Sequence, residues 1–406
     1  MHTHAASARR LIAMLALLAM IGPFAIDTFF PAFPAIAQAL QASPFEMQQT
    51  LSVYLMAYAL MSLLHGGLSD ALGRRPVILA ALLVFTLASI GCALTDTMQH
   101  LLWFRAVQGL SAGAGVIVGR AIVRDCFEGA RAQRVMSGVS MLFGVAPAIA
   151  PIVGGYLLVF GWRASFWFLA LFSAALLAAC WRLLPESLPA EKRTPLHPWS
   201  LARGYAHMLR NHRFVLLGFA GGFNFSAIFL YISSAPAFVL DILGMNERQF
   251  AAFFVPTISG MVLGAYLSGR MAGKVQSRTA IPIAYGVMLL AAVINIGYTQ
   301  WTQPVHWPMA VLPVAMIAVA VAIAFPLLSL AMMDVFPDRR GAASSLQMFL
   351  SLVVNAAVSG LLAPLVQSDA RSLALAASSL TLSGLVLYLL ARKAIPLDPR
   401  AQAAQR

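Results

Sequence analysis

Long apolar stretches recur along this chain and are separated by short polar connections. Each has roughly the 20 residues that an α-helix needs to cross the hydrocarbon core of a bilayer. Six stretches precede a long polar connection over residues 184–212, and six follow it. They cover residues 11–37, 48–68, 76–95, 99–121, 135–158 and 163–183, and then 213–236, 248–270, 280–298, 308–333, 341–366 and 371–392. The pattern predicts an all-α membrane protein with twelve transmembrane helices in two six-helix bundles.

The composition also indicates a membrane protein, because 60% of the 406 residues are hydrophobic and only 10% are charged. Soluble globular domains contain about 25% charged residues. We expect an N-terminal bundle over residues 1–190, a cytoplasmic linker over 191–212 and a C-terminal bundle over 213–406. The first apolar stretch is too long for the h-region of a signal peptide, so we interpret it as a retained helix. A cleaved signal peptide is the alternative.

The net charge of +13 comes from basic residues in the short loops between apolar stretches. A nucleic-acid-binding domain would gather such residues on one face or helix, so no nucleic acid partner is expected. If the N-terminus lies in the cytoplasm, all but four of the 27 Lys and Arg residues fall on the inner side or at inner helix ends. The four exceptions are Arg105, Arg163, Arg248 and Arg371. This asymmetry follows the positive-inside rule and predicts that both termini are cytoplasmic.

The sequence contains no pattern typical of a metal site, a cofactor or an enzyme. The three cysteines, Cys92, Cys126 and Cys180, are far apart and form no CxxC pair. Gly273-Lys274 resembles the end of a P-loop, but Val275 stands where the Mg²⁺-binding Ser or Thr is required. We therefore expect no catalytic residues, no metal and no cofactor, and a proton gradient as the energy source.

Asp27 is the one acidic residue inside an apolar stretch. A carboxylate at that depth costs roughly 2.5–3.5 kcal/mol on insertion scales, so we interpret Asp27 as a proton site. From the helical rise, Asp27 and Arg105 lie about 5 and 9 Å beyond the midplane on the same side, where an ion pair, direct or through water, is feasible. Asp27 would take up a proton when open outward and release it inward. The alternative is a structural acid paired permanently with a polar group.

Aromatic and amide side chains near the expected middle of the membrane would suit the wall of a substrate pocket. The candidates are Phe30, Tyr54, Tyr58, Gln108, Phe223, Asn224, Tyr231, Gln347 and Asn355. Each amide could equally form a hydrogen bond between helices. Tyr54 and Tyr58 share one helix face, which could instead face lipid.

The connection between the second and third stretches reads Gly66-Gly-Leu-Ser-Asp70-Ala-Leu-Gly73-Arg74-Arg75-Pro. It resembles the loop signature of the major facilitator superfamily, with Ala71 where a basic residue is usual. Glycines there permit a tight turn and close helix approach. The resemblance implies that Asp70 faces the N-terminus of a helix starting near Gly341, where unpaired N–H groups attract a carboxylate.

Further segments resemble the bicyclomycin- and chloramphenicol-resistance (Bcr/CflA-type) branch of drug:proton antiporters. The segments are Asp27-Thr-Phe-Phe-Pro-Ala-Phe-Pro, Arg105-x-x-Gln108-Gly109, Arg120-x-x-x-Arg124-Asp125, Gly144-x-x-Pro147-x-x-x-Pro151-x-x-Gly154-Gly155 and Leu184-Pro-Glu186. The resemblance implies a monomeric multidrug exporter of the bacterial cytoplasmic (inner) membrane, which exchanges small hydrophobic drugs or metabolites for protons by alternating access. It would contribute to antibiotic resistance.

Eleven loop and helix residues are candidates for conformational gating in that cycle. They are Gly66, Asp70, Gly73, Arg74, Arg75, Arg124, Asp125, Pro147, Pro151, Gly154 and Gly155. Two other functions remain open at this point. One is a carrier that imports a small nutrient by symport or facilitation, and the other is a membrane sensor or subunit that transports nothing.

Overall fold

The computed structural model describes residues 2–392, and none of them lies in a β-strand. Eleven helical segments in this part of the chain are long and apolar enough to cross a membrane. Two further helices, α3 (Pro44–Ser62) and α4 (His65–Leu72), meet the same criteria when taken together as a twelfth span, and they bend by 47° at the break between them. The predicted all-α membrane architecture is confirmed.

The helices form two compact units. Unit 1 contains the described residues up to His197 together with Asn246–Phe254. Unit 2 contains Pro198–Met245 and the described residues from Val255 onward.

Unit 1 begins with a span that is broken into three pieces. Besides α3 and α4, its elements are α1 (His2–Asp27), η1 (Phe30–Ala32), α2 (Phe33–Leu40), α5 (Arg74–Leu94), α6 (Met98–Ala112), α7 (Ala114–Cys126), α8 (Gly129–Leu157), η2 (Leu158–Phe160), α9 (Arg163–Leu183) and η3 (Ala190–Lys192).

Unit 2 begins with a short helix that precedes its first membrane span. Its elements are α10 (Pro198–Leu209), α11 (His212–Ser233), the π-helical η4 (Ala237–Ile242), most of α12 (Ala251–Met271), α13 (Ser277–Trp301), α14 (Leu312–Met333), η5 (Pro337–Arg339), α15 (Arg340–Ala357), the π-helical η6 (Val358–Leu362), α16 (Ala363–Val366) and α17 (Ala370–Ala391).

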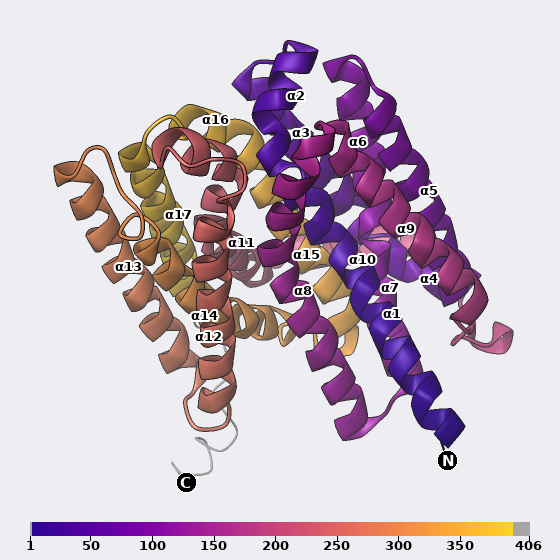
Figure 1. The fold of residues 1–406 in the computed structure, drawn as a ribbon. Helices are drawn as coiled ribbons and strands as arrows, with labels where there is room; N and C mark the ends of the chain where they lie inside the picture. The colour runs from indigo at the N-terminus through magenta and orange to yellow at the C-terminus, as the bar shows by residue number, and fades with distance from the viewer. Residues whose placement is uncertain (1, 393–406) are drawn as a thin grey trace, which may run out of the picture. The chain divides into compact units, whose positions relative to one another are not determined.

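Within unit 1, α1 runs alongside α8, α3 packs against α6, and α5 packs against both α6 and α9 (Figure 1). Within unit 2, α11 is the central helix, since it packs against α14, α15 and α17. Nearly every residue from Ala220 to Ser233 is buried, in keeping with this position. Small residues such as Gly221 and Gly222 allow neighbouring helices to approach α11 closely.

The first span was predicted as one helix over residues 11–37, but it is interrupted directly after Asp27. The chain passes through Thr28 and Phe29 into η1 and then α2. Pro31 and Pro34 lie in the interrupted region. Proline has no backbone N–H, so the carbonyls four residues earlier lose their helical donors. One of those carbonyls belongs to Asp27, which places the buried acid at a helix end.

Several helices begin at side chains that accept hydrogen bonds from the first turn. Ser43 and Glu46 form a capping box at α3, with the Ser43 amide donating to Glu46 Oε2 over 2.8 Å. Asp369 accepts from the amide of Ser372 over 2.9 Å at the start of α17. Such caps satisfy amides that have no partner within the helix.

Candidate functional site

Asp27 is the only buried acidic side chain among residues 2–392, and it is 2% exposed. Its Oδ1 atom has no hydrogen-bond partner, and neither does the buried hydroxyl of the adjacent Thr28. An ionised carboxylate at this position would lack both water and a counter-ion, which is costly in a low-dielectric interior. The end of α1 thus presents a polar group that the rest of the fold leaves unsatisfied.

Arg105 of α6 lies close to the end of α1 and is fully buried. Its Nη1 donates to the main-chain oxygen of Ala25 over 3.0 Å and to Gln108 Oε1 over 2.8 Å. Its Nε donates to the main-chain oxygen of Thr50 over 3.1 Å. The Arg105 side chain therefore contacts α1, α3 and its own helix.

Arg105 and Asp27 do not form a direct ion pair in this structure. Among the described residues, no carboxylate oxygen lies within 4.0 Å of the Arg105 guanidinium. Its Nε and Nη1 atoms donate to neutral carbonyl groups, and the buried Nη2 has no partner. The site therefore contains one carboxyl group and one guanidinium group on neighbouring elements of unit 1. Each has one polar atom without a partner, Oδ1 of Asp27 and Nη2 of Arg105.

Aromatic rings cover the Arg105 guanidinium. Its central carbon lies 4.5 Å from the ring centre of Phe29 and 4.5 Å from that of Tyr54, both within the range of cation–π attraction. Tyr54 is followed by Tyr58, whose ring lies 6.3 Å away in an edge-on arrangement. Both tyrosines are buried inside unit 1, so they do not face lipid.

The remaining substrate candidates of unit 1 lie close to the same residues. Gln108 accepts from Arg105 and donates to Ser89 Oγ over 2.8 Å, which extends the polar network into α5. Phe30 is fully buried in η1 and packs edge-on against Phe33. The structure thus brings Phe30, Tyr54, Tyr58 and Gln108 near the end of α1.

The substrate candidates of unit 2 mostly form bonds between helices. Asn224 of α11 contacts Met288 of α13 over 3.3 Å, and Tyr231 accepts from Asn295 of α13 over 2.7 Å. Two candidates lie on α15. Asn355 accepts from Ser226 of α11 over 2.7 Å, and Gln347 donates to Ser329 of α14. Phe223 is partly exposed on α11 and forms no such bond.

The loop signature forms a compact charged cluster at the α4–α5 connection. Arg74 is buried and donates from Nη1 to Asp70 and from Nε to Asp125 Oδ2 over 3.0 Å. Arg75 donates to the main-chain oxygen of Trp181 at the end of α9. Four predicted gating residues, Asp70, Arg74, Arg75 and Asp125, therefore belong to one network.

Glu186 is a member of this cluster that the sequence did not single out as a site residue. Its two carboxylate oxygens accept from the amides of Arg74 and Arg75 over 3.0 and 3.2 Å, so it caps the start of α5. Gly73 makes this contact possible. It has φ of 103°, and a Cβ at this position would lie 2.5 Å from Glu186 Oε2. The Leu184-Pro185-Glu186 segment was the only signal in the sequence.

The other predicted gating residues are spread more widely. Gly66 has no heavy atom within 4 Å of the place where a Cβ would lie, and Arg124 is exposed at the end of α7. Pro147 and Pro151 lie inside α8, which stays helical through both. Gly155 lies against the main chain of Glu247, in the short later segment that belongs to unit 1.

Gly154 connects α8 to the acid site. A Cβ at this position would lie 1.8 Å from the main-chain oxygen of Thr28, directly after Asp27. Only glycine allows α8 to approach the broken part of the first span so closely. The predicted gating motif of α8 is therefore in direct contact with the segment that carries the buried acid.

Membrane-spanning helical units that bury a charged site around interrupted helices are typical of secondary transporters. The chain belongs to the Major Facilitator Superfamily, whose family model matches residues 15–359. It is a multi-pass membrane transporter of small molecules and not an enzyme.

Two relatives have names that refer to drug resistance. A bicyclomycin resistance protein homologue from Haemophilus influenzae is 30% identical over 308 residues, which cover 74% of this chain and 75% of the relative. Multidrug resistance protein D from Escherichia coli K12 is 27% identical over 383 residues, covering 93% of this chain and 94% of that protein. The sequence resemblance to this branch is therefore confirmed.

A solved structure shares the fold. The bacterial homologue of the human lysosomal transporter Spinster matches with a TM-score of 0.73 and 18% identity, over 97% of this chain and 99% of that one. At this level of identity the similarity establishes the fold alone.

Proposed function

We propose that the protein exports small, mostly hydrophobic drugs or metabolites and that each export step is driven by proton entry through alternating access. Bicyclomycin resistance and multidrug resistance in the names of its relatives support the substrate class. The observation that carries the proton-coupling part is the Asp27 carboxyl group, which is buried and has an oxygen without a partner.

In the proposed cycle, Asp27 holds a proton while the site is closed to water. Opening to the outer side hydrates the acid and allows proton uptake, and opening to the inner side allows release. Arg105 supports this exchange, because its Nη2 has no partner and can bond to the carboxylate once the proton has left. The bonds from Nη1 and Nε to Ala25 and Thr50 keep the guanidinium next to α1 throughout.

The substrate would bind near the same residues. The rings of Phe29, Tyr54 and Tyr58 provide apolar surface beside a few polar atoms, as sites for hydrophobic ligands usually do. In unit 2, Asn224, Gln347 and Asn355 would contribute only after exchanging their present partners, while the bond between Tyr231 and Asn295 would mainly join two helices. Competition between substrate and proton for this region would produce antiport.

One carboxyl group implies one proton per cycle. A driving force on the order of 150 mV supplies about 3.5 kcal/mol per proton, from the value of 2.3 kcal/mol per 100 mV. This energy supports a substrate gradient of a few hundredfold, since about 1.4 kcal/mol corresponds to tenfold.

We further propose that the protein is a monomer in the bacterial cytoplasmic (inner) membrane, with both termini in the cytoplasm. The distribution of Lys and Arg supports this orientation, because their excess lies on one side of the predicted spans. In that membrane, protons that move down their gradient enter the cytoplasm, which is the direction that proton-driven export requires.

Flux measurements in proteoliposomes test the proposal. Purified protein is reconstituted, a pH gradient is imposed, and the movement of bicyclomycin, chloramphenicol and hydrophobic dyes is followed together with internal pH. We expect substrate and protons to move in opposite directions in the wild type and the proton-driven component to vanish in Asp27→Asn. Asp96→Asn is the matched control, because Asp96 is exposed and pairs with Arg163.

Each other outcome has a clear meaning. Proton-driven efflux that persists in Asp27→Asn would place the coupling site elsewhere. Substrate and proton moving in the same direction would identify an importer. No substrate-dependent proton movement with any compound would favour a protein that does not transport.

A further inference from the structure

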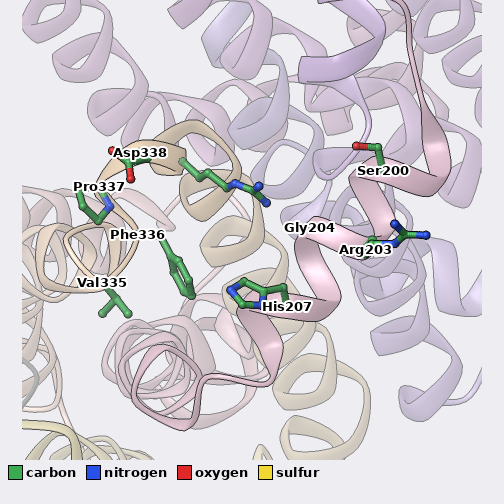
Figure 2. A pocket seen from close by; sticks show the side chains of 9 residues that line it. Ser200, Arg203, Gly204, His207, Val335, Phe336, Pro337 and Asp338 are labelled. Carbon is green, nitrogen blue, oxygen red and sulfur yellow. The ribbon is translucent and has the colours of Figure 1, made fainter.

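Unit 2 contains a cavity of about 550 Å³ that the proposed transport cycle does not use. It lies between the short helix α10 and the segment 335–339 that leads into α15 (Figure 2). The α10 side consists of Ser200, Arg203, Gly204 and His207. A volume of this size is within the range of small-molecule sites.

Packing against the rest of unit 2 fixes the position of α10. Met208 is fully buried, and the Tyr205 side chain bonds to Ser345 of α15. Figure 2 shows the side chains of His207 and Phe336 next to each other in the cavity lining. Their ring centres lie 5.8 Å apart in an edge-on arrangement. Phe336 also packs edge-on against Phe214 of α11. The cavity is therefore formed by anchored elements.

The charge of the cavity lining is mostly basic. Arg203 and Arg339 both line it, and no carboxylate among residues 2–392 lies within 4.0 Å of either guanidinium. Arg339 approaches α10 closely, since its Nη1 lies 3.5 Å from the position of a Cβ on Gly204. Asp338 is the one acidic group in the lining. Arg340, by contrast, is neutralised by Asp334 over 2.8 Å.

Two unpaired guanidinium groups, a histidine and the Ser200 hydroxyl form a suitable set of donors for a phosphate group. Guanidinium groups present N–H donors in a planar fork that matches phosphate oxygens. The cavity is formed by α10 and residues 335–339, which include none of the proposed substrate residues. We therefore treat it as separate from the transport site.

The surface of α10 indicates which kind of molecule would carry the phosphate group. Trp199 is 75% exposed and Leu209 is 42% exposed, while the Arg203 guanidinium lies 5.9 Å from the Trp199 ring. Exposed Trp and Leu next to basic residues are typical of helices that lie in the membrane interface. Basic pockets at the cytoplasmic ends of transmembrane helices bind anionic lipid headgroups.

We propose that this cavity binds the phosphate headgroup of an anionic phospholipid from the cytoplasmic leaflet, held by Arg203 and Arg339. The bound lipid would fasten α10, and with it the linker, to the membrane surface. The proposal uses the cytoplasmic orientation proposed above but does not depend on Asp27 or on proton exchange.

Lipid retention by the purified full-length protein tests this site. The protein is incubated with phosphatidylglycerol or phosphatidylcholine in detergent micelles, and bound lipid is counted by native mass spectrometry. We expect wild-type protein to retain phosphatidylglycerol preferentially and the double variant Arg203→Gln/Arg339→Gln to bind it roughly thirtyfold more weakly. Arg340→Gln removes one positive charge next to the cavity, from an arginine that is paired with Asp334, and should behave as the wild type.

Asp338→Asn provides a test in the opposite direction. Because it removes the one acidic group of the lining, it should increase phosphatidylglycerol retention while leaving phosphatidylcholine unchanged. Size-exclusion chromatography and circular dichroism of each variant establish that it is folded.

Three outcomes would overturn the proposal. Equal retention in the double variant and in Arg340→Gln would mean that Arg203 and Arg339 contribute nothing specific to lipid binding. If the double variant lost phosphatidylglycerol retention but Asp338→Asn did not change it, recognition by this lining would be excluded. Thermal stabilisation by inorganic phosphate, lost in the double variant and without any lipid preference, would identify a soluble phosphate ligand instead. Coupled transport is a separate readout, so a failure here leaves the Asp27 mechanism untouched.

Discussion

The guanidinium of Arg105 donates a hydrogen bond over 3.0 Å to the main-chain oxygen of Ala25, two residues before Asp27. A second bond of 3.1 Å reaches the main-chain oxygen of Thr50. The charge of Arg105 is thus held by backbone carbonyls, whose positions depend on how α1 and α3 pack and not on the protonation of any acid. The Arg105 guanidinium can therefore stay in place while Asp27 gains or loses its proton.

Replacing Arg105 with lysine should destabilise the protein even though the charge is kept. A lysine ammonium has its three N–H donors on one nitrogen, so it cannot reach Ala25, Thr50 and Gln108 together as the planar guanidinium does. Each lost bond to a charged donor is worth about 1.5–3 kcal/mol. We expect a clear drop in melting temperature in detergent, measured by tryptophan fluorescence. Arg163→Lys, at an exposed ion pair with Asp96, is the control and should melt close to the wild type.

Gly154→Ala should disturb the contact between α8 and the first span. A Cβ at this position would lie 1.8 Å from the oxygen of Thr28, and a backbone oxygen cannot move aside as a flexible side chain can. We expect reduced thermal stability and impaired transport. Gly144→Ala in the same helix is the matched control, since a Cβ there meets nothing within 4 Å. If both variants behave alike, the close contact with Thr28 is not what stabilises this region.

Glu186→Gln should weaken the charged cluster at the start of α5. The glutamine keeps the size of the side chain but has one acceptor oxygen in place of two, and it loses the charge that favours a helix N-terminus. A cap of this kind contributes about 1 kcal/mol. Thermal unfolding of purified protein measures the loss, and Glu191→Gln, an exposed residue of η3, supplies the baseline. Equal melting temperatures for the two variants would exclude a capping role.

Hydropathy was sufficient to predict the eleven spans and the bent pair α3–α4, because bilayer thickness fixes the length of an apolar helix whatever its neighbours are. It could not show that the first span breaks after Asp27 or that α3 and α4 bend by 47°. Apolar residues remain apolar through a break, so the hydropathy of these spans stays high. Pro31 and Pro34 were visible in the sequence, but proline inside a membrane helix bends it in some proteins and not in others. Pro147 and Pro151, which leave α8 helical, illustrate the difference.

The candidate site was only partly predictable for a different reason. Asp27 and Arg105 stand out because buried charge is rare in a membrane segment. The partners of Arg105 are backbone carbonyls, which every residue has and which therefore leave no trace in a sequence. Glu186 reaches Arg74 across 112 residues of chain, a contact that only the packing of α5 against α9 creates. The orientation of Tyr54 and Tyr58 toward the bundle interior likewise depended on the neighbouring helices.

The Tyr231–Asn295 pair can be assigned to substrate binding or to structure by a double-mutant cycle. The Asn295 amide donates to the Tyr231 hydroxyl over 2.7 Å, and both side chains are buried. If the bond mainly joins α11 to α13, each of Tyr231→Phe and Asn295→Leu leaves one polar group unpaired and should cost about 1–3 kcal/mol. The double variant should recover much of that loss, because no orphaned group remains. We expect this recovery in thermal unfolding, with the substrate profile in drug-susceptibility assays unchanged. Altered drug preference in Tyr231→Phe at wild-type stability would instead indicate that the hydroxyl binds substrate.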